Sequence, residues 1–127
     1  MMIDDDDEDQ WIIREALVDL NAEELATFAS NGEEALALLD KRYSSQNDTP
    51  KLIILDLNMP IMNGTATLAR LKADERFRNI PVIIYSTSVN PFERDKCMEL
   101  GAHSYIIKPI SIEESALTMQ TFLSFCQ

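Results

Sequence analysis

Two hydrophobic periodicities alternate along the 127 residues of this chain, and this alternation constrains its fold more than any other feature. Short apolar runs typical of strands occupy residues 1–3, 26–30, 52–57, 80–86 and 104–108, and a segment with helical spacing follows each of them. Strands that alternate with helices through short connections form a parallel sheet with helices on both faces and right-handed crossovers. We therefore predict an α/β fold with three layers: a doubly wound, five-stranded parallel sheet in the order 2-1-3-4-5, covered by helices.

Capping and turn residues mark the ends of several helices. Asn31 with Glu34, and Ser111 with Glu114, have the spacing of capping boxes that open a helix. The polar segment RYSSQNDTPK (42–51) contains turn residues and a proline, and it predicts a loop before the third strand.

Composition narrows the class of protein and of partner. Apolar residues make up 46% and charged residues 26%, which is typical of a globular domain with one core. Two cysteines form no disulfide framework, and no apolar window is long enough to span a membrane, so we expect a cytoplasmic protein. A net charge of −11 argues against binding to nucleic acid or to anionic lipid, and favours proteins or cations as partners.

Charged and polar side chains stand at the carboxyl ends of the predicted strands. The apolar run LIIL ends on Asp56, and the first strand ends on Asp4 and Asp5. Ser86 ends the fourth predicted strand and Lys108 ends the fifth. In a sheet of this order, ligands bind outside the carboxyl ends of the strands, at the switch point between strands 1 and 3. We therefore expect these five side chains to share one rim.

The chemistry of this set suits phosphoryl transfer. Three neighbouring carboxylates repel one another unless a cation joins them, and an all-oxygen cluster suits a hard cation such as Mg²⁺. An ammonium from Lys108 and a hydroxyl from Ser86 add donors for an anionic phosphoryl group. Asp56 could then act as the nucleophile and form an acyl phosphate.

These residues and their spacing resemble the receiver domain of two-component response regulators, over essentially the whole chain. The resemblance implies a flavodoxin-like (βα)5 domain over residues 1–127 with no output domain. It implies that Asp56 is the phosphoacceptor and that Asp4 and Asp5 are the acidic pair of a site for Mg²⁺, with Mn²⁺ as a substitute. The backbone carbonyl of Asn58 would be a further metal ligand, and Gly64 matches the glycine of the family's loop after the phosphoacceptor.

The same resemblance implies a switch at the ends of the last two strands. Ser86 stands at the family's switch Thr or Ser position, and Lys108 is the catalytic lysine that precedes a proline, Pro109, expected to be cis. Tyr105 falls at the aromatic switch position. On phosphorylation, Ser86 would move toward the new oxygens and Tyr105 would turn inward. The face that changes would comprise the fourth helix, the strand at 104–108 and the last helix.

The implied function is signalling rather than ordinary catalysis. A sensor histidine kinase or histidine phosphotransfer protein would donate the phosphoryl group, and a downstream protein target would recognise the changed face. The segment STSVNPFERDKCMELGAHSYIIKPIS further resembles small regulators paired with phytochrome-type kinases. Phe122 and Phe125 widen the apolar stripe of the last helix, which suggests a homodimer through the switching face.

Other interpretations stay open at this level. The chain could pass its phosphoryl group onward as a phosphorelay intermediate, or it could be a pseudo-receiver that keeps the fold without the chemistry. An aspartate-nucleophile phosphatase is less consistent, since LDLNMP has Asn58 where such enzymes carry a second aspartate, and no cap insertion follows. The acidic pair within residues 4–7 is ambiguous by one position, because only three residues precede it. Trp11 predicts either a docking patch or packing against a loop.

Overall fold

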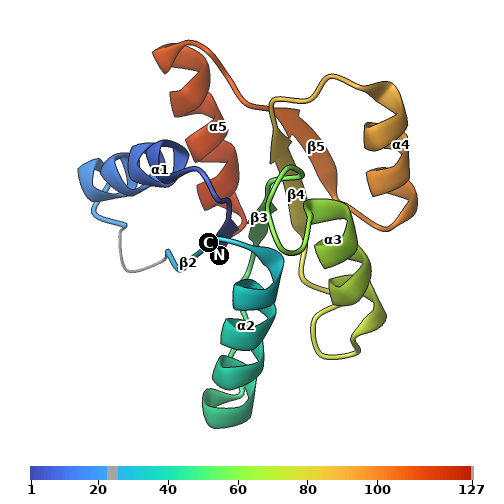
Figure 1. The fold of residues 1–127 in the computed structure, drawn as a ribbon. Helices are drawn as coiled ribbons and strands as arrows, with labels where there is room; N and C mark the ends of the chain where they lie inside the picture. The colour runs from blue at the N-terminus through green and yellow to red at the C-terminus, as the bar shows by residue number, and fades with distance from the viewer. Residues whose placement is uncertain (23–25, 127) are drawn as a thin grey trace.

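The computed structural model describes residues 1–22 and 26–126 of the chain. Five strands each precede a helix, as Figure 1 shows. The strands are β1 (Met2–Ile3), β2 (Phe28–Ala29), β3 (Ile53–Leu55), β4 (Val82–Ser86) and β5 (Ser104–Ile107). The helices are α1 (Asp7–Asp19), α2 (Gly32–Gln46), α3 (Gly64–Ala73), α4 (Pro91–Glu99) and α5 (Ile112–Ser124).

The strands form one parallel sheet in the order β2-β1-β3-β4-β5, which confirms the predicted topology. Strand β1 has only two residues, yet it lies between β2 and β3, with Met2 opposite Phe28 on one side and Ile54 on the other. The N-terminal amine extends this pairing, because it donates a hydrogen bond of 2.8 Å to the carbonyl of Leu52. The short first strand is therefore held between β2 and β3, beside the strand that Asp56 follows.

Side chains alternate along the strands and build a core on each face of the sheet. Ile3, Ile53 and Leu55 point to one face, where α2, α3 and α4 supply Leu39, Leu68, Leu71 and Cys97. Met2, Ile54 and Tyr85 point to the other face, where α1 and α5 supply Ile13, Leu17, Met119 and Phe122. Figure 1 shows the same division, with α1 and α5 on one side of the sheet and α2, α3 and α4 on the other. The sheet is packed on both faces, so the carboxyl ends of its strands lie together at one edge between the two layers of helices.

The structure confirms Asn31 and Ser111 as N-caps, although neither Glu34 nor Glu114 returns a bond to the N-cap N–H, whereas the predicted loop at 42–51 begins too early. The side chains of Asn31 and Ser111 accept hydrogen bonds from the backbone N–H groups of Glu34 and Glu114. Helix α2 continues to Gln46, and its C-cap, Asn47, adopts the left-handed conformation with φ 50°. Tertiary contact explains the extension, because Tyr43 packs edge-on against Phe77 with ring centroids 6.1 Å apart.

The two phenylalanines at the end of α5, Phe122 and the C-cap Phe125, differ in burial. Phe122 is buried, and its ring meets Tyr85 edge-on at 5.4 Å, so it completes the core instead of widening an exposed stripe. Phe125 is half-buried and packs edge-on against the exposed turn residue His103. The buried Phe122 therefore offers no exposed surface for a homodimer.

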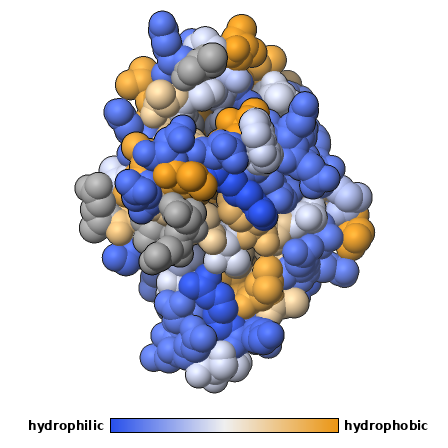
Figure 2. Space-filling model, turned by 90° about the vertical axis from the view of Figure 1, so that its left-hand side faces the viewer, coloured by the Kyte–Doolittle hydropathy of each residue, from blue (hydrophilic) through white to orange (hydrophobic). Residues whose placement is uncertain are grey.

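Apolar side chains are exposed on α1 without forming a continuous surface. Trp11 is 61% exposed, which excludes packing beneath a loop, and Ile12, Val18 and Leu20 are also exposed. Figure 2 shows the side of the molecule on which α1 lies, with apolar side chains scattered among hydrophilic ones. Scattered exposure of this kind is normal for a protein surface and assigns no partner.

Candidate functional site

The turn after β1 fixes the first two aspartates of the site. Asp4 is 1% exposed, and its backbone N–H donates to the carbonyl of Ala29 at 3.0 Å, which continues the pairing of β1 with β2. Gln10 of α1 donates its side-chain amide to the Asp4 carbonyl at 2.6 Å. Asp6 caps α1, so the chain leaves Asp4, passes the exposed Asp5 and enters the helix at once. The sequence alone left the acidic pair ambiguous; here Asp4 and Asp5 turn toward Asp56.

The loop after β3 fixes Asp56. Its backbone N–H donates to the Ile3 carbonyl at 2.9 Å, and its carboxylate Oδ1 accepts from the Leu57 N–H at 2.9 Å. Gly64 opens α3 directly against this loop. A Cβ at Gly64 would lie 2.1 Å from the Asp56 carbonyl oxygen, so only glycine allows this approach. By lacking a side chain, Gly64 lets the start of α3 lie this close to the loop that carries Asp56.

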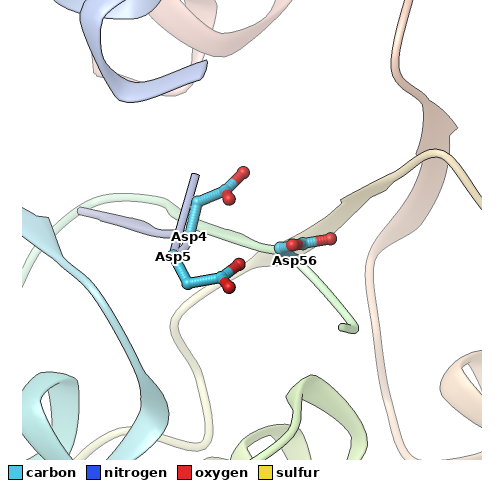
Figure 3. A group of neighbouring side chains, drawn as sticks. All are labelled: Asp4, Asp5 and Asp56. Atoms are coloured by element: carbon cyan, nitrogen blue, oxygen red, sulfur yellow. The ribbon is translucent and has the colours of Figure 1, made fainter. Parts of the chain in front are cut away.

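Three carboxylates meet at the carboxyl ends of β1 and β3. Asp4, Asp5 and Asp56 each offer an oxygen, and these oxygens all lie within 4.8 Å of one another (Figure 3). In Figure 3, the side chains of Asp4 and Asp5 extend toward the side on which Asp56 lies. An all-oxygen cluster with two buried members and one exposed member fits a hard, partly hydrated cation such as Mg²⁺.

Burial makes the two buried carboxylates of this cluster, Asp4 and Asp56, weaker acids than usual. Burial, with a further contribution from the Asp4 charge, raises the pKa of Asp56 from 3.8 to about 6. Burial also raises the pKa of Asp4, although the hydrogen bond from Lys108 opposes that rise. A bound cation would remove this penalty by stabilising the ionised forms. The electrostatics of the cluster therefore favour a metal ion.

Lys108 brings a positive charge to the same cluster. Its Nζ lies 2.8 Å from Asp4 Oδ2, 2.6 Å from Asp9 Oδ2 and 3.9 Å from Asp56 Oδ2. Burial alone would lower the pKa of Lys108, but the hydrogen bonds to Asp4 and Asp9 raise it above its ordinary value, so the ammonium keeps its proton. The Lys108 backbone N–H donates to the Ser86 carbonyl at 2.8 Å, which aligns the ends of β4 and β5.

The peptide bond that follows Lys108 departs from the expectation. No peptide bond among the described residues is cis, so the bond between Lys108 and Pro109 is trans. Trans is the more stable form of an X–Pro bond by about 0.5–1 kcal/mol. The Lys108 side chain reaches the carboxylates with this trans bond in place.

Asp9 is the residue of this site that the sequence interpretation missed. It lies in the first turn of α1 and is the nearer of the two carboxylates that hold Lys108. One signal was available in the sequence: Asp9 stands four residues before the buried Ile13 and eight before the buried Leu17, so it begins the inward stripe of the helix. Within a run of six acidic residues, that phase was the distinguishing feature.

The end of β4 and the loop after it form a second group of contacts. Ser86 is fully buried, and its Oγ accepts from the Ser88 N–H at 3.2 Å. The Tyr105 hydroxyl donates to the Ser88 carbonyl at 2.9 Å, and the ring packs against the core on the α2–α4 face. The Ser88 hydroxyl also donates to the carboxylate of Glu93 in the first turn of α4. Ser88 therefore links Ser86, Tyr105 and α4.

Comparison with known proteins decides the family. The model of the response regulator receiver domain family matches residues 1–119 of the chain. This chain is a response regulator receiver domain. The chemotaxis protein CheY1 of Helicobacter pylori strain J99 is 33% identical over 111 residues, which cover 87% of this receiver and 85% of CheY1.

Two solved structures support the resemblance to phytochrome-associated regulators. The phosphorylated cyanobacterial phytochrome response regulator RcpA is 29% identical with a TM-score of 0.86, over 98% of this receiver and 89% of RcpA. The Mn²⁺-bound form of response regulator Rcp1 is 26% identical with a TM-score of 0.79, over 98% and 90% of the two chains. The predicted flavodoxin-like receiver fold and the predicted family are both confirmed.

Family membership establishes the general role of this receiver. Receiver domains are signalling proteins of two-component systems, which bind Mg²⁺ at an acidic pocket and interact with histidine kinases and downstream targets. The acidic cluster of this receiver supports Mg²⁺ binding. Within residues 1–22 and 26–126, no helix combines the length and apolar character needed to cross a membrane.

Proposed function

We propose that this receiver takes a phosphoryl group onto Asp56 from the phosphohistidine of a sensor histidine kinase or a histidine phosphotransfer protein. The observation that carries the proposal is the meeting of Asp56 with Asp4, Asp5 and Lys108 at one rim, where the ammonium is bonded to Asp4 and lies 3.9 Å from Asp56. The rim lies at the carboxyl ends of the strands, where a partner's phosphohistidine can reach it.

The transfer is a nucleophilic displacement at phosphorus. A carboxylate oxygen of Asp56 attacks, a P–O bond forms, the P–N bond to the histidine breaks, and the electron pair returns to the imidazole nitrogen. Lys108 Nζ, 3.9 Å from Asp56 Oδ2, can donate to a phosphoryl oxygen and offset its developing charge. Mg²⁺, or Mn²⁺ in its place, would be held by Asp4, Asp5, Asp56 and the Asn58 carbonyl, and would supply Lewis-acid stabilisation of the phosphoryl oxygens.

The signal then passes along the contacts of Ser86 and Ser88. A phosphoryl group on Asp56 gives the Ser86 hydroxyl a strong new acceptor, and a shift of Ser86 moves the Ser88 N–H that is bonded to it. Ser88 in turn holds the hydroxyl of Tyr105 and the carboxylate of Glu93. The switch therefore acts on the face formed by α4, β5 and α5.

The proposed output is contact with a downstream protein. Four apolar side chains are exposed on this face: Phe92 on α4, Ile107 on β5, Ile110 in the loop that follows β5, and Leu117 on α5. A net charge of −11 favours a protein partner over nucleic acid. A homodimer through the same face would use these side chains and not the buried Phe122.

Intact-mass spectrometry tests the proposal. The receiver is incubated with acetyl phosphate and Mg²⁺, beside Asp56→Asn and a sample with excess chelator. We expect one phosphoryl adduct on the wild type, and none on Asp56→Asn or on the chelated sample. If folded wild type carries no adduct with either acetyl phosphate or a panel of phosphorylated histidine phosphotransfer proteins, the chain is a pseudo-receiver and the proposal fails.

A further inference from the structure

One carboxylate that the proposed function leaves without a role touches the site. Asp9 extends from the first turn of α1, and its Oδ2 lies 2.6 Å from Lys108 Nζ. We propose that Asp9 is a positioning residue that holds the Lys108 ammonium on the α1 side of the site, and thereby limits how readily Asp56 takes up and keeps a phosphoryl group. The inference rests on the proposed role of Asp56 as phosphoacceptor.

The distances around Lys108 show which carboxylates hold it. An ammonium has three N–H donors. Two of them point to Asp9 at 2.6 Å and to Asp4 at 2.8 Å, whereas Asp56 at 3.9 Å lies beyond hydrogen-bond distance. The Lys108 side chain is only 10% exposed, so water screens these charge-assisted bonds weakly. In this state, Lys108 is bonded to Asp9 of α1 and to Asp4, which follows β1, and not to Asp56.

Asp9 differs from Asp4 in its relation to the carboxylate cluster. Asp4 belongs to the set of oxygens within 4.8 Å that suits a cation, and Asp9 does not. A cation in the cluster would draw on the negative charge of Asp4 and leave that of Asp9 intact. Asp9 then becomes the stronger partner of Lys108. For the ammonium to donate fully to a phosphoryl oxygen on Asp56, its bond to Asp9 must lengthen.

The backbone of Asp9 is anchored, so its carboxylate cannot simply follow the lysine. The Asp9 N–H donates to the capping carboxylate of Asp6 at 3.2 Å. Gln10, which is buried, ties the same turn to the carbonyls of Asp4 and Ala29. One helical turn later, Ile13 enters the core beneath α5. Movement of Asp9 toward Asp56 would require this whole turn to move.

The variants separate the charge of Asp9 from its structural surroundings. Asp9→Asn keeps the shape and removes the charge that holds Lys108. Asp9→Glu keeps the charge on a longer arm and serves as the conservative rescue. Asp7→Asn is the matched control, because Asp7 is exposed in the same helical turn and its substitution changes the net charge equally.

The assay measures binding of beryllofluoride, a stable mimic of the phosphoryl group, to each variant at saturating Mg²⁺. Calorimetry gives the affinity, and ¹⁹F NMR reports the fluorine that Lys108 contacts. We expect Asp9→Asn to bind about tenfold more tightly, the scale of one charge-assisted hydrogen bond released to the ligand. We also expect Asp9→Asn to show a shifted ¹⁹F resonance and faster phosphoryl uptake from acetyl phosphate. The affinities of Asp7→Asn and Asp9→Glu for beryllofluoride should stay within about twofold of wild type, because long-range charge effects are screened in Asp7→Asn and the charge is kept in Asp9→Glu.

The outcomes distinguish failure of this inference from failure of the proposed function. If wild type binds beryllofluoride and Asp9→Asn binds it equally or more weakly, Asp9 is only a structural partner of Lys108 and the inference is wrong. Equal tightening by Asp7→Asn and Asp9→Asn would also refute it, since net charge alone would explain the change. If wild type binds no beryllofluoride and forms no phosphoryl adduct, the proposed function fails and this inference fails with it.

Discussion

Replacing Asp56 by asparagine should stabilise the metal-free receiver at neutral pH. Asp56 is 7% exposed, lies beside Asp4 and receives only a distant interaction from Lys108 at 3.9 Å. Burial is the main cause of the rise of its pKa from 3.8 to about 6. A carboxyl group whose pKa is higher in the folded state lowers stability progressively as the pH rises from the unfolded pKa to the folded pKa, because the unfolded state releases its proton first.

The magnitude follows from the shift. A rise from 3.8 to about 6 corresponds to about 3 kcal/mol, at 1.36 kcal/mol per pKa unit. Solvent at the open rim relaxes around the charge, so we expect a gain of ~1–2 kcal/mol in the free energy of unfolding for Asp56→Asn at neutral pH. The sign of the pH dependence is also set: the cost of Asp56 develops between pH ~4 and ~6 and is complete above ~6. The advantage of Asp56→Asn should therefore shrink as the pH falls below ~6.

Urea denaturation in the presence of a chelator, in a series from about pH 5 to 8, measures this difference. In excess Mg²⁺, the wild type should instead be more stable than Asp56→Asn. Ligand binding stabilises the folded wild type by about 2.7 kcal/mol at one hundred times its dissociation constant, and Asp56→Asn loses one of the metal's ligands. The reasoning is refuted if chelated Asp56→Asn is no more stable than wild type at pH 7.5, or if its advantage is the same at pH 5.

Two further predictions concern the buried Met1 amine and the backbone conformation of Ile61. Burial lowers the pKa of the Met1 amine from 8.0 to about 6. The free energy of unfolding should therefore rise by up to ~2–3 kcal/mol as the pH increases from ~6 to ~8. Nα-acetylation should remove this rise in a series of denaturant titrations at different pH. Ile61 is 74% exposed and adopts a left-handed conformation with φ 69°, which is unfavourable for a β-branched residue. Ile61→Asn should therefore stabilise the receiver by about 1 kcal/mol in thermal melts, whereas a gain of equal size in Ile61→Val, which stays β-branched, would contradict that explanation.

The sheet order and most of the site were predictable from the sequence because a parallel sheet places the carboxyl ends of its strands at one edge. Asp56, Ser86 and Lys108 each stand at the end of an apolar run, and the structure brings them to the same rim. Their roles in phosphoryl transfer stay predictions, and so does the Asn58 carbonyl as a metal ligand. The apolar runs show where each strand ends, and this was enough to predict which side chains lie at the rim.

Contacts between elements were less predictable, because they depend on which neighbour a side chain meets. The end of α2 has a polar sequence, and it stays helical since Tyr43 packs on Phe77. Phe122 was expected on an exposed stripe, and it is buried since Tyr85 of β4 offers a ring to pack against. The sequence shows that these aromatic residues are present, but it does not show which of them pack together in the fold.

Asp9 shows how the same limit applies to the charge balance of the site. The sequence suggests three carboxylates, one ammonium and a cation, whereas the structure places a fourth carboxylate on Lys108. The positive charge of the lysine is therefore already shared between Asp4 and Asp9 before any ligand arrives. That sharing leaves Asp56 poorly compensated, which agrees with the raised pKa of its carboxyl group. The arrangement that lowers the stability of the metal-free receiver is thus the one that makes Asp56 receptive to a cation.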